Sequence, residues 1–299
     1  MLFVSYNIQF GCGRDRRIDL DRIARTIKDA DAVALQEVER DWRPDQPHPD
    51  QAARLAALMP YHHWVHGAST DLDGSRVGPD GKVDNRRRRF GNMILSRWPI
   101  ASTRIVPLPT LPVSGEINDQ SSLLEAVIDI GERSFRLYNV HLNHVSGRQR
   151  LMQLGVAMPF IQESSRRGGM ITAPNFKGEL PVGDWLVLPH GRLPVMPAPV
   201  IFAGDFNSRP DSPEYDLLTG PRDPVYGRVT EADRFADALT LSGLTEGEGV
   251  TFPASGGKPA TRIDHCFVSM DLIPRVRRAW IDDDADGSDH QPVWMEIDL

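Results

Sequence analysis

The sequence predicts an α/β (α+β) fold: one layered domain over residues 1–299, in which helices cover β-strands. Short apolar runs typical of strands recur along the chain, often in adjacent pairs, and stretches with helical periodicity lie between them. No tandem repeat and no linker divides the chain cleanly. Apolar residues make up 40% of the chain and charged residues 25%, which is typical of a globular protein with a large core.

The individual strands and helices are predicted from local periodicity and turn residues. Strand-like runs lie at residues 2–8, 31–38, 91–97, 102–108, 122–130, 134–142, 200–202, 262–269, 276–282 and 291–299. Helices are expected over residues 18–30, 48–58, 147–163, 212–219 and 233–241. Asp19 is placed as the N-cap of the first helix, where Ile23 and Ile27 repeat at helical spacing. The pair Gly131-Glu132 joins two strand-like runs and predicts a hairpin turn.

Two stretches are predicted to be loops. Residues 67–90 are rich in Gly, Asp and Arg and lack apolar periodicity, which indicates an exposed loop. Residues 164–199 contain several prolines and predict a loop-rich insertion, which we expect near the functional site. Its apolar residues would form a lid, meet a lipid tail or nucleobase, or fold back on the body. They are Phe176, Trp185, Leu186, Val187 and Leu188.

The overall charge and the cysteine count restrict the class of protein. A net charge of -7 gives no electrostatic signature of bulk nucleic-acid binding, although an acidic enzyme can carry a local basic groove. No apolar run approaches the roughly 18 residues that span a bilayer. Cys12 and Cys266 are too few for a disulfide framework. We expect a cytoplasmic monomer, with secretion as the alternative location.

The stretch "IFAGDFNSRP" places Asp205 and Asn207 at the point where an apolar strand ends. On an extended chain, residues two apart point to the same side, so both polar groups would face one point beyond the strand. Ligand sites in layered α/β proteins favour that place. The alternative is a simple polar loop, because Gly, Asp, Asn, Ser and Pro all form turns.

Polar side chains also close several other strand-like runs. These are Asn7, Glu37, His141, Asp264 and the pair Asp289-His290. Carboxylate and amide oxygens are hard ligands that suit Mg²⁺, Mn²⁺ or Ca²⁺ rather than zinc. A hard metal together with a His–Asp pair suits hydrolysis at phosphorus, because the metal neutralises phosphate charge while the histidine takes a proton from water. Neither a zinc motif nor a nucleophile elbow nor a Walker A loop occurs.

In their order, the segments "YNIQFG", "LQEV", "GNMILSR", "NVHLNH", "GDFN", "RIDH" and "SDH" resemble the endonuclease/exonuclease/phosphatase superfamily, which includes deoxyribonuclease I and neutral sphingomyelinases. The resemblance runs from residue 5 to residue 290. It implies a four-layer sandwich of two mixed β-sheets packed face to face with helices outside, and a site at one edge of the sandwich. It also implies a divalent-metal-dependent hydrolase of phosphate esters.

The resemblance assigns a role to each strand-end residue. Glu37 is the principal metal ligand with Asn7 beside it, and Asp289 is a further metal-site carboxylate. Asp205 and Asn207 bind or orient the attacking water and the phosphate. His290, oriented by Asp264, is the general base or a hydrogen-bond donor to the transition state, and His141 contacts the scissile phosphate and acts as an acid. Asn92 is a structural or a phosphate-side residue, and Arg150 and Gln153 match a recurrent R-x-x-Q that would lie behind the site.

The substrate stays open at this point. Relatives similar to exonuclease III carry a W-N-V-N-G type first motif and a tyrosine where this chain has His141, so the sequence departs from the abasic-site repair branch. Arg86, Arg87, Arg88 and Arg89 could contact a polyanion, or could offset nearby acids in a solvated loop. We expect a phosphodiesterase, with a lipid or small-molecule diester ahead of the alternatives. These are a DNA/RNA nuclease of the same mechanism and a non-catalytic binding module that retains the fold.

Overall fold

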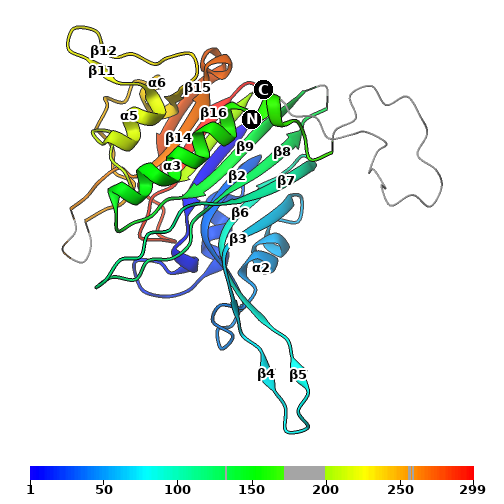
Figure 1. Ribbon diagram of the computed structural model, residues 1–299. Helices are drawn as coiled ribbons and strands as arrows, with labels where there is room; N and C mark the ends of the chain where they lie inside the picture. The colour runs from blue at the N-terminus through cyan, green and yellow to red at the C-terminus, as the bar shows by residue number, and fades with distance from the viewer. Residues whose placement is uncertain (132, 172–198, 255–256, 258) are drawn as a thin grey trace.

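The computed structural model describes residues 1–299 except 132, 172–198, 255–256 and 258. Two six-stranded β-sheets pack face to face in it (Figure 1). The first has the order β15-β16-β1-β2-β6-β3, from Val276–Ile281, Val293–Ile297, Leu2–Asn7, Ala32–Arg40, Arg87–Ser96 and His63–Asp73. The second has the order β13-β14-β10-β9-β8-β7, from Phe235–Asp237, Asp264–Ser269, Val200–Asp205, Ser134–His141, Ser122–Asp129 and Ile100–Pro107.

Both sheets are mixed. In the first sheet β1 runs parallel to β2, and in the second β9 runs parallel to β10, while the remaining neighbours are antiparallel. Parallel neighbours end at the same edge of a sheet, so each sheet presents two adjacent carboxyl ends at one edge. Asn7, His141 and Asp205 lie at these ends, whereas Glu37 lies inside β2 rather than at its end, and Asp264 begins β14.

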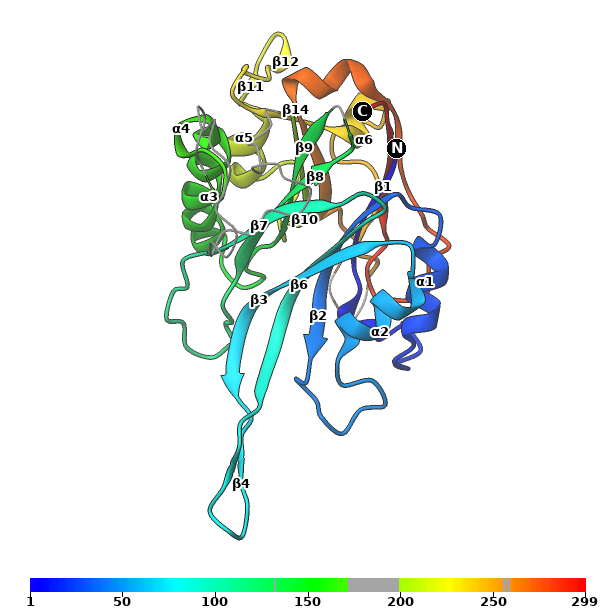
Figure 2. The ribbon, with the colours of Figure 1, turned by 90° about the vertical axis from the view of Figure 1, so that its right-hand side faces the viewer.

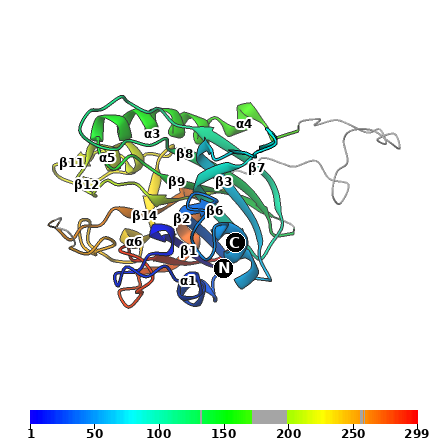
Figure 3. The same cartoon turned by 90° about the horizontal axis from the view of Figure 1, so that it is seen from below.

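The helices cover the outer faces of the two sheets (Figures 2 and 3). They are α1 (Leu20–Ile27), α2 (Gln51–Leu58), α3 (Gly147–Gln162), α4 (Ser164–Arg167), α5 (Pro213–Thr219) and α6 (Ala238–Leu241). Helices α1 and α2 pack on the first sheet, where Ile23 and Leu55 meet Val33. Helices α3 and α5 pack on the second sheet, where Leu154 and Leu218 join a cluster with other buried apolar residues. The predicted four-layer sandwich is confirmed.

The central core lies between the sheets. Phe3, Ala34 and Ile94 of the first sheet pack in one buried cluster with Leu137 and Ile201 of the second. These strands are apolar on both faces because one face meets the other sheet and the opposite face meets helices. This arrangement explains why the sequence shows continuous apolar runs rather than strict alternation.

Asparagine 139 ties the two sheets together inside this core. Its Nδ2 donates to the carbonyls of Leu35 and Met93 at 2.8 and 2.9 Å, and its Oδ1 accepts from Gln36 Nε2 at 2.8 Å. Leu35, Gln36 and Met93 belong to the first sheet, whereas Asn139 belongs to β9 of the second. The fully buried bonds fix the two sheets relative to each other close to the ends of β2 and β9.

Local capping begins the first helix as predicted. Asp19 accepts a hydrogen bond from the Arg22 backbone N–H, and Ile23 and Ile27 are fully buried. The second helix begins at Gln51, three residues later than predicted, because Asp50 caps it.

The predicted loop over residues 67–90 is wrong. Strand β3 runs to Asp73 and β6 begins at Arg87, and between them β4 (Arg76–Val77) pairs with β5 (Val83–Asp84). Together they form a two-stranded arm that projects from the body (Figures 1 and 2). Water bathes both faces of the arm, so its residues have no apolar periodicity. Opposite charges pair across its strands, as Asp71 does with Arg87 at 2.8 Å.

Two further predictions change in the structure. The helix expected over 233–241 divides into the short strand β13 and helix α6, because Asp237 ends the strand and caps the helix. The insertion contains α4 at its start, and its apolar residues from Phe176 to Leu188 lie outside the described residues. The last residue of the insertion is Pro199, and its carbonyl accepts a hydrogen bond from the Arg136 N–H of β9. Pro199 directly precedes β10, so the insertion ends at the opposite end of that strand from Asp205.

Across the described residues, the structure holds no helix that is long and apolar enough to span a membrane.

Candidate active site

Three neighbouring strands of the second sheet bring His141, Asp205 and Asp264 side by side. Asp205 ends β10 and pairs in register with His141 at the end of parallel β9. On its other side it pairs with Asp264, which begins antiparallel β14. His141 Nε2 lies 3.5 Å from Asp205 Oδ2, and its Nδ1 lies 4.0 Å from Glu37 Oε1. The acidic neighbours of His141 are therefore Asp205 and Glu37, which the sequence did not reveal.

The first sheet contributes Asn7 and Glu37 to the same place. Asn7 ends β1, and its Nδ2 donates to Glu37 Oε1 and to Asp205 Oδ2, both at 3.0 Å. Glu37 lies where the pairing of β2 with β6 shifts, and it has a φ of 60°. Such a left-handed residue within a strand is strained and is typical of functional sites, where it redirects a side chain. Asn7 thus holds one carboxylate from each sheet.

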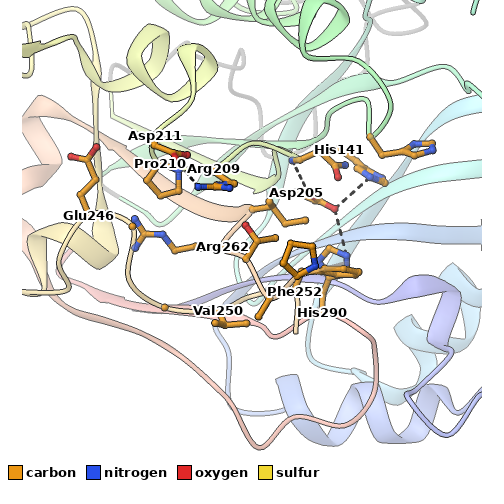
Figure 4. A pocket seen from close by; sticks show the side chains of 18 of the residues that line it. His141, Asp205, Arg209, Pro210, Asp211, Glu246, Val250, Phe252, Arg262 and His290 are labelled. Atoms are coloured by element: carbon orange, nitrogen blue, oxygen red, sulfur yellow. Dashed lines mark hydrogen bonds and ion pairs between the residues drawn. The ribbon is translucent and has the colours of Figure 1, made fainter. Parts of the chain in front are cut away.

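The last element of the site is His290, in the segment before β16. Its Nδ1 lies 2.8 Å from Asp264 Oδ2, and its Nε2 lies 3.7 Å from Asp205 Oδ2. Burial opposes the charge on His290, but the Asp264 and Asp205 carboxylates outweigh burial and raise its pKa to about 10. The ring of Phe252 packs 5.0 Å from the imidazole. Figure 4 shows His141 and His290 on either side of Asp205.

Asp289 lies at the site beside His290, and its side chain is hydrogen-bonded by Gln9, a residue that was not predicted from the sequence. Gln9 Nε2 donates to Asp289 Oδ2 at 2.8 Å. Burial, and then the charge of Glu37, raise the pKa of Asp289. The Gln9 backbone has a φ of 44°, in the left-handed region, and its N–H donates to Asn7 Oδ1. The sequence feature that could have indicated a role for Gln9 is its position two residues after Asn7, in the same short segment.

Asn207 forms a turn around the end of β10. Its backbone N–H donates to Asp205 Oδ1 at 2.8 Å, its φ is 48°, and its Nδ2 donates to the Leu142 carbonyl at 2.9 Å. The stretch is therefore a polar turn and also part of the site, so the two alternatives from the sequence are both present.

Asn92, Arg150 and Gln153 lie behind these residues. Asn92 is buried in β6 and donates to the carbonyls of Ser122 and Asn139 in the second sheet. Arg150 donates to the Asn143 carbonyl, and Gln153 accepts from the Asn143 N–H at 2.9 Å. These contacts brace the turn that follows His141.

The four arginines of the "RRRR" run lie along the arm and the start of β6. Arg86 pairs with Asp84, while Arg87 and Arg89 pair with Asp71. Arg88 donates to the Trp42 carbonyl. Within the described part of the chain, none of the four lines the cavity that contains the site.

That cavity has a volume of about 1190 Å³ and opens over the site. Glu37, Asp205 and Asp289 line it together with both site histidines. Three carboxylates with an amide between two of them form the hard oxygen donor set that suits a divalent cation. Asp205, Asp264 and His290 also offer ligand atoms within 4.8 Å of one another, although the Asp264–His290 hydrogen bond occupies one atom of each. The residues present thus fit a divalent metal of the hard class.

A two-sheet sandwich with a His–Asp pair and clustered carboxylates at one edge defines a metal-dependent hydrolase of phosphate esters. The chain belongs to the Endonuclease/Exonuclease/phosphatase family, whose sequence pattern matches residues 4–290. Members of this family are divalent-metal-dependent phosphoric ester hydrolases, and this protein is a phosphohydrolase of that superfamily.

Three solved structures illustrate the range of proteins that share this fold. An endonuclease/exonuclease/phosphatase from Beutenbergia cavernae is 22% identical, with a TM-score of 0.65, and the match covers 100% of this chain and 71% of the other. A mannosyl-6-phosphatase from Bacteroides thetaiotaomicron is 18% identical, with a TM-score of 0.62 and full coverage of both chains, 100% each. A truncated TDP2 from Caenorhabditis elegans is 18% identical, with a TM-score of 0.58, and the match covers 98% of this chain and 95% of the other. Comparison with curated proteins found no match. At these identities the likeness shows the fold alone.

Proposed function

We propose that the protein is a Mg²⁺- or Mn²⁺-dependent phosphodiesterase that acts on a small, polar substrate. The observation that carries this proposal is the Asp264–His290 pair, with its Nδ1–Oδ2 distance of 2.8 Å, whose His290 lines one cavity with Asp205, His141 and Glu37. These groups match the needs of water attack on phosphorus: a proton acceptor for water, a proton donor for the leaving oxygen and oxygen ligands for a cation.

The chain's own groups divide the reaction between them. His290 Nε2 accepts a proton from water as the water oxygen bonds to phosphorus, and Asp264 holds Nδ1 and stabilises the resulting imidazolium. His141 donates a proton to the leaving oxygen as its bond to phosphorus breaks. Asn7 keeps Glu37 and Asp205 together. A bound divalent cation would supply positive charge that polarises the phosphate and offsets the carboxylates that raise the pKa of His290.

The walls of the cavity favour a polar substrate over a lipid. Beyond the site, the cavity is lined by the charged residues Arg209, Asp211, Asp216, Arg222 and Glu246, together with apolar residues such as Val250 and Ile263. A volume of about 1190 Å³ exceeds what a phosphate group fills, so both arms of a diester have room. Three of the four arginines in the run pair with acids and Arg88 donates to the Trp42 carbonyl, so a nuclease is the second candidate. The phosphatase and the TDP2 among the similar structures support phosphate-ester chemistry without choosing a substrate.

A substrate panel tests the proposal. Purified protein with Mg²⁺ is assayed on bis(p-nitrophenyl) phosphate, plasmid DNA, single-stranded DNA, RNA, sphingomyelin, inositol phosphates and a nucleotide monophosphate, with His290→Ala as the background. We expect hydrolysis of the small diester to exceed that of the polymers and of sphingomyelin, and to vanish in the variant. Preferred cleavage of DNA or RNA would support the nuclease, and preferred cleavage of the monophosphate would overturn the diesterase.

The chain carries every catalytic and metal-ligand residue that the resemblance implies, which supports an enzyme over a non-catalytic binding module, whereas Arg86, Arg87, Arg88 and Arg89 lie away from the cavity. The single domain over residues 1–299, the monomeric state and the cytoplasmic location stay predictions from the sequence.

A further inference from the structure

The cavity over the site extends well beyond the residues that the proposed reaction uses. One end holds Glu37, Asp205 and Asp289, whereas the other end lies against α5, the hairpin of β11 (Arg222–Asp223) and β12 (Gly227–Arg228), and the segment around Glu246. Glu37, Asp205 and Asp289 are the carboxylates of the first end, whereas at the far end Asp211, Asp216 and Glu246 lie beside arginines. Four arginines line the cavity away from the carboxylates of the first end: Arg209, Arg222, Arg228 and Arg262. They determine what the far end can bind.

Two of these arginines are committed to the protein itself. The side chain of Arg262 is 0% exposed and lies 3.5 Å from Asp237 in the interior. Arg228 is nearly buried, and it donates to Asp216, to Glu246 and to the carbonyls of Gly220 and Pro210. The contacts of Arg228 occupy its guanidinium, and the Arg262 guanidinium is fully buried although its nitrogens lack hydrogen-bond partners, so neither group is exposed to a ligand in this structure.

The other two arginines are accessible. The side chain of Arg209 is 62% exposed and pairs with Asp211, which is 67% exposed. The side chain of Arg222 is 60% exposed, and its Nε donates to Glu246 at 3.1 Å. An ion pair between exposed side chains is weak, so a phosphate can replace Asp211 on Arg209 without a large penalty. Each guanidinium has five N–H donors, most of which these contacts leave for a ligand.

A continuous set of contacts links the two chain segments that carry the accessible arginines. Glu246 accepts from Arg222 and from Arg228, and Arg228 donates to the Pro210 carbonyl, next to Arg209 in the chain. Arg222 and Arg228 also face each other across the β11–β12 hairpin. Arg209 follows Asn207 by two residues, so the catalytic turn leads directly to it. In the view of Figure 4, Arg209 lies between Asp205 and Glu246.

We propose that Arg209 and Arg222 bind a second phosphate of the substrate, one arm away from the phosphate that is cleaved. Planar guanidinium groups recognise phosphate oxygens through paired hydrogen bonds, and two of them in one cavity match a dianion. The ligand is therefore a phosphate ester that carries another phosphate, either a small bisphosphate or the adjoining nucleotide of a nucleic acid. This subsite rests on the proposed phosphodiesterase activity.

The test compares two p-nitrophenyl phosphodiesters that differ in one arm, which ends either in a neutral alcohol or in a phosphate. We expect the wild-type protein to have a KM about tenfold or more lower for the phosphate-bearing ester, with similar kcat values for both. Arg209→Ala with Arg222→Ala should remove most of that preference and leave the KM for the neutral ester unchanged. Arg209→Lys should restore less than half of it, because an ammonium lacks the paired donors.

Arg277→Ala is the matched control. Arg277 is 62% exposed and pairs with Asp298, which is 53% exposed, so the variant removes an equivalent surface cation from β15. Equal loss of preference in this control, or an unchanged preference in the double variant, would overturn the subsite. Absence of hydrolysis of both esters by the wild-type protein would instead overturn the phosphodiesterase.

A third measurement separates the two sources of the second phosphate. A short single-stranded oligonucleotide and a small bisphosphate compete with the neutral ester in the wild-type protein and in the double variant. If one compound inhibits the double variant about tenfold more weakly than the wild-type protein, the result supports the subsite and identifies that compound as the kind of ligand that supplies the second phosphate. Equal inhibition of both proteins by both compounds contradicts it.

Discussion

Asp264 and His290 come from different sheets and meet at the edge of the sandwich. Asp264 begins β14 of the second sheet, His290 precedes β16 of the first, and the distance between Asp264 Oδ2 and His290 Nδ1 is 2.8 Å. The pair therefore depends on the packing of the two sheets as well as on the two residues.

Removal of either member should abolish most of the activity. His290→Ala and Asp264→Asn are expected to lower kcat for a small phosphodiester by about 10²- to 10⁴-fold, because the first removes the proton acceptor and the second removes the carboxylate that orients it. Steady-state kinetics measure the effect, and thermal unfolding shows whether each variant is folded. A folded variant that retains more than about half of the wild-type kcat would contradict the assigned roles.

Removal of metal should have the same effect on rate and should also lower stability. EDTA is expected to abolish activity and Mg²⁺ to restore it. Mg²⁺ should also raise the melting temperature, because a cation relieves the repulsion among Glu37, Asp205 and Asp289 and binds only the folded state. In Glu37→Gln the thermal shift should shrink, whereas Glu116→Gln, which changes an exposed acid elsewhere, should keep it. Full activity in EDTA would remove the metal from the mechanism.

Asn139 should be important for stability without touching substrate. Asn139→Leu leaves the carbonyls of Leu35 and Met93 and the amide of Gln36 without their buried partner. We expect the free energy of unfolding to fall by about 3 kcal/mol or more. Urea denaturation measures the change, and Asn85→Ala in the exposed arm should alter stability by less than about 0.5 kcal/mol. Equal changes in both variants would mean that the buried bonds between the sheets contribute little.

His66 should make the protein sensitive to mild acid. Burial lowers its pKa to about 4 from 6.5, although the Val38 carbonyl that its Nε2 contacts opposes this shift. Between these pH values the unfolded chain binds a proton that the folded chain excludes, so stability falls as the pH drops from 6.5 towards 4. The loss should reach about 3 kcal/mol. His66→Gln keeps a donor for the carbonyl without titrating, so its stability should depend less on pH in denaturation curves. An identical pH dependence in both proteins would contradict this origin.

The arginine run should matter little for a small substrate. Arg86, Arg87 and Arg89 pair with acids of the arm and of β3, away from the cavity. Changing Arg86 to Arg89 to alanine is therefore expected to leave kcat/KM for a small phosphodiester within about twofold. A rise in KM for oligonucleotides alone would support the polyanion contact that the sequence allowed.

Much of the fold could be predicted, because the local pattern of apolar and polar residues indicates which side chains of a strand or helix are buried. Apolar runs of strand length predict buried strands, and apolar residues at helical spacing predict helices that cover them. These patterns predict a layered fold without specifying which strands pair. The prediction failed for residues 67–90, where a two-stranded arm is exposed on both faces and charge pairing replaces apolar alternation. It also failed within 233–241, where a single residue, Asp237, ends a strand and caps a helix.

The sequence by itself determined that acids, amides and histidines lie at or near the ends of apolar strands, and hence that they would gather at a sheet edge, although Glu37 lies inside β2 at a shift in its pairing. Only the tertiary structure decided which of them touch. The Asp264–His290 pair, the Gln9–Asp289 contact and the bonds from Asn7 to Glu37 and Asp205 all join chain segments far apart in sequence. Periodicity specifies which face of a strand is buried, whereas the distance between two side chains depends on how the two sheets pack, and no local pattern contains that information.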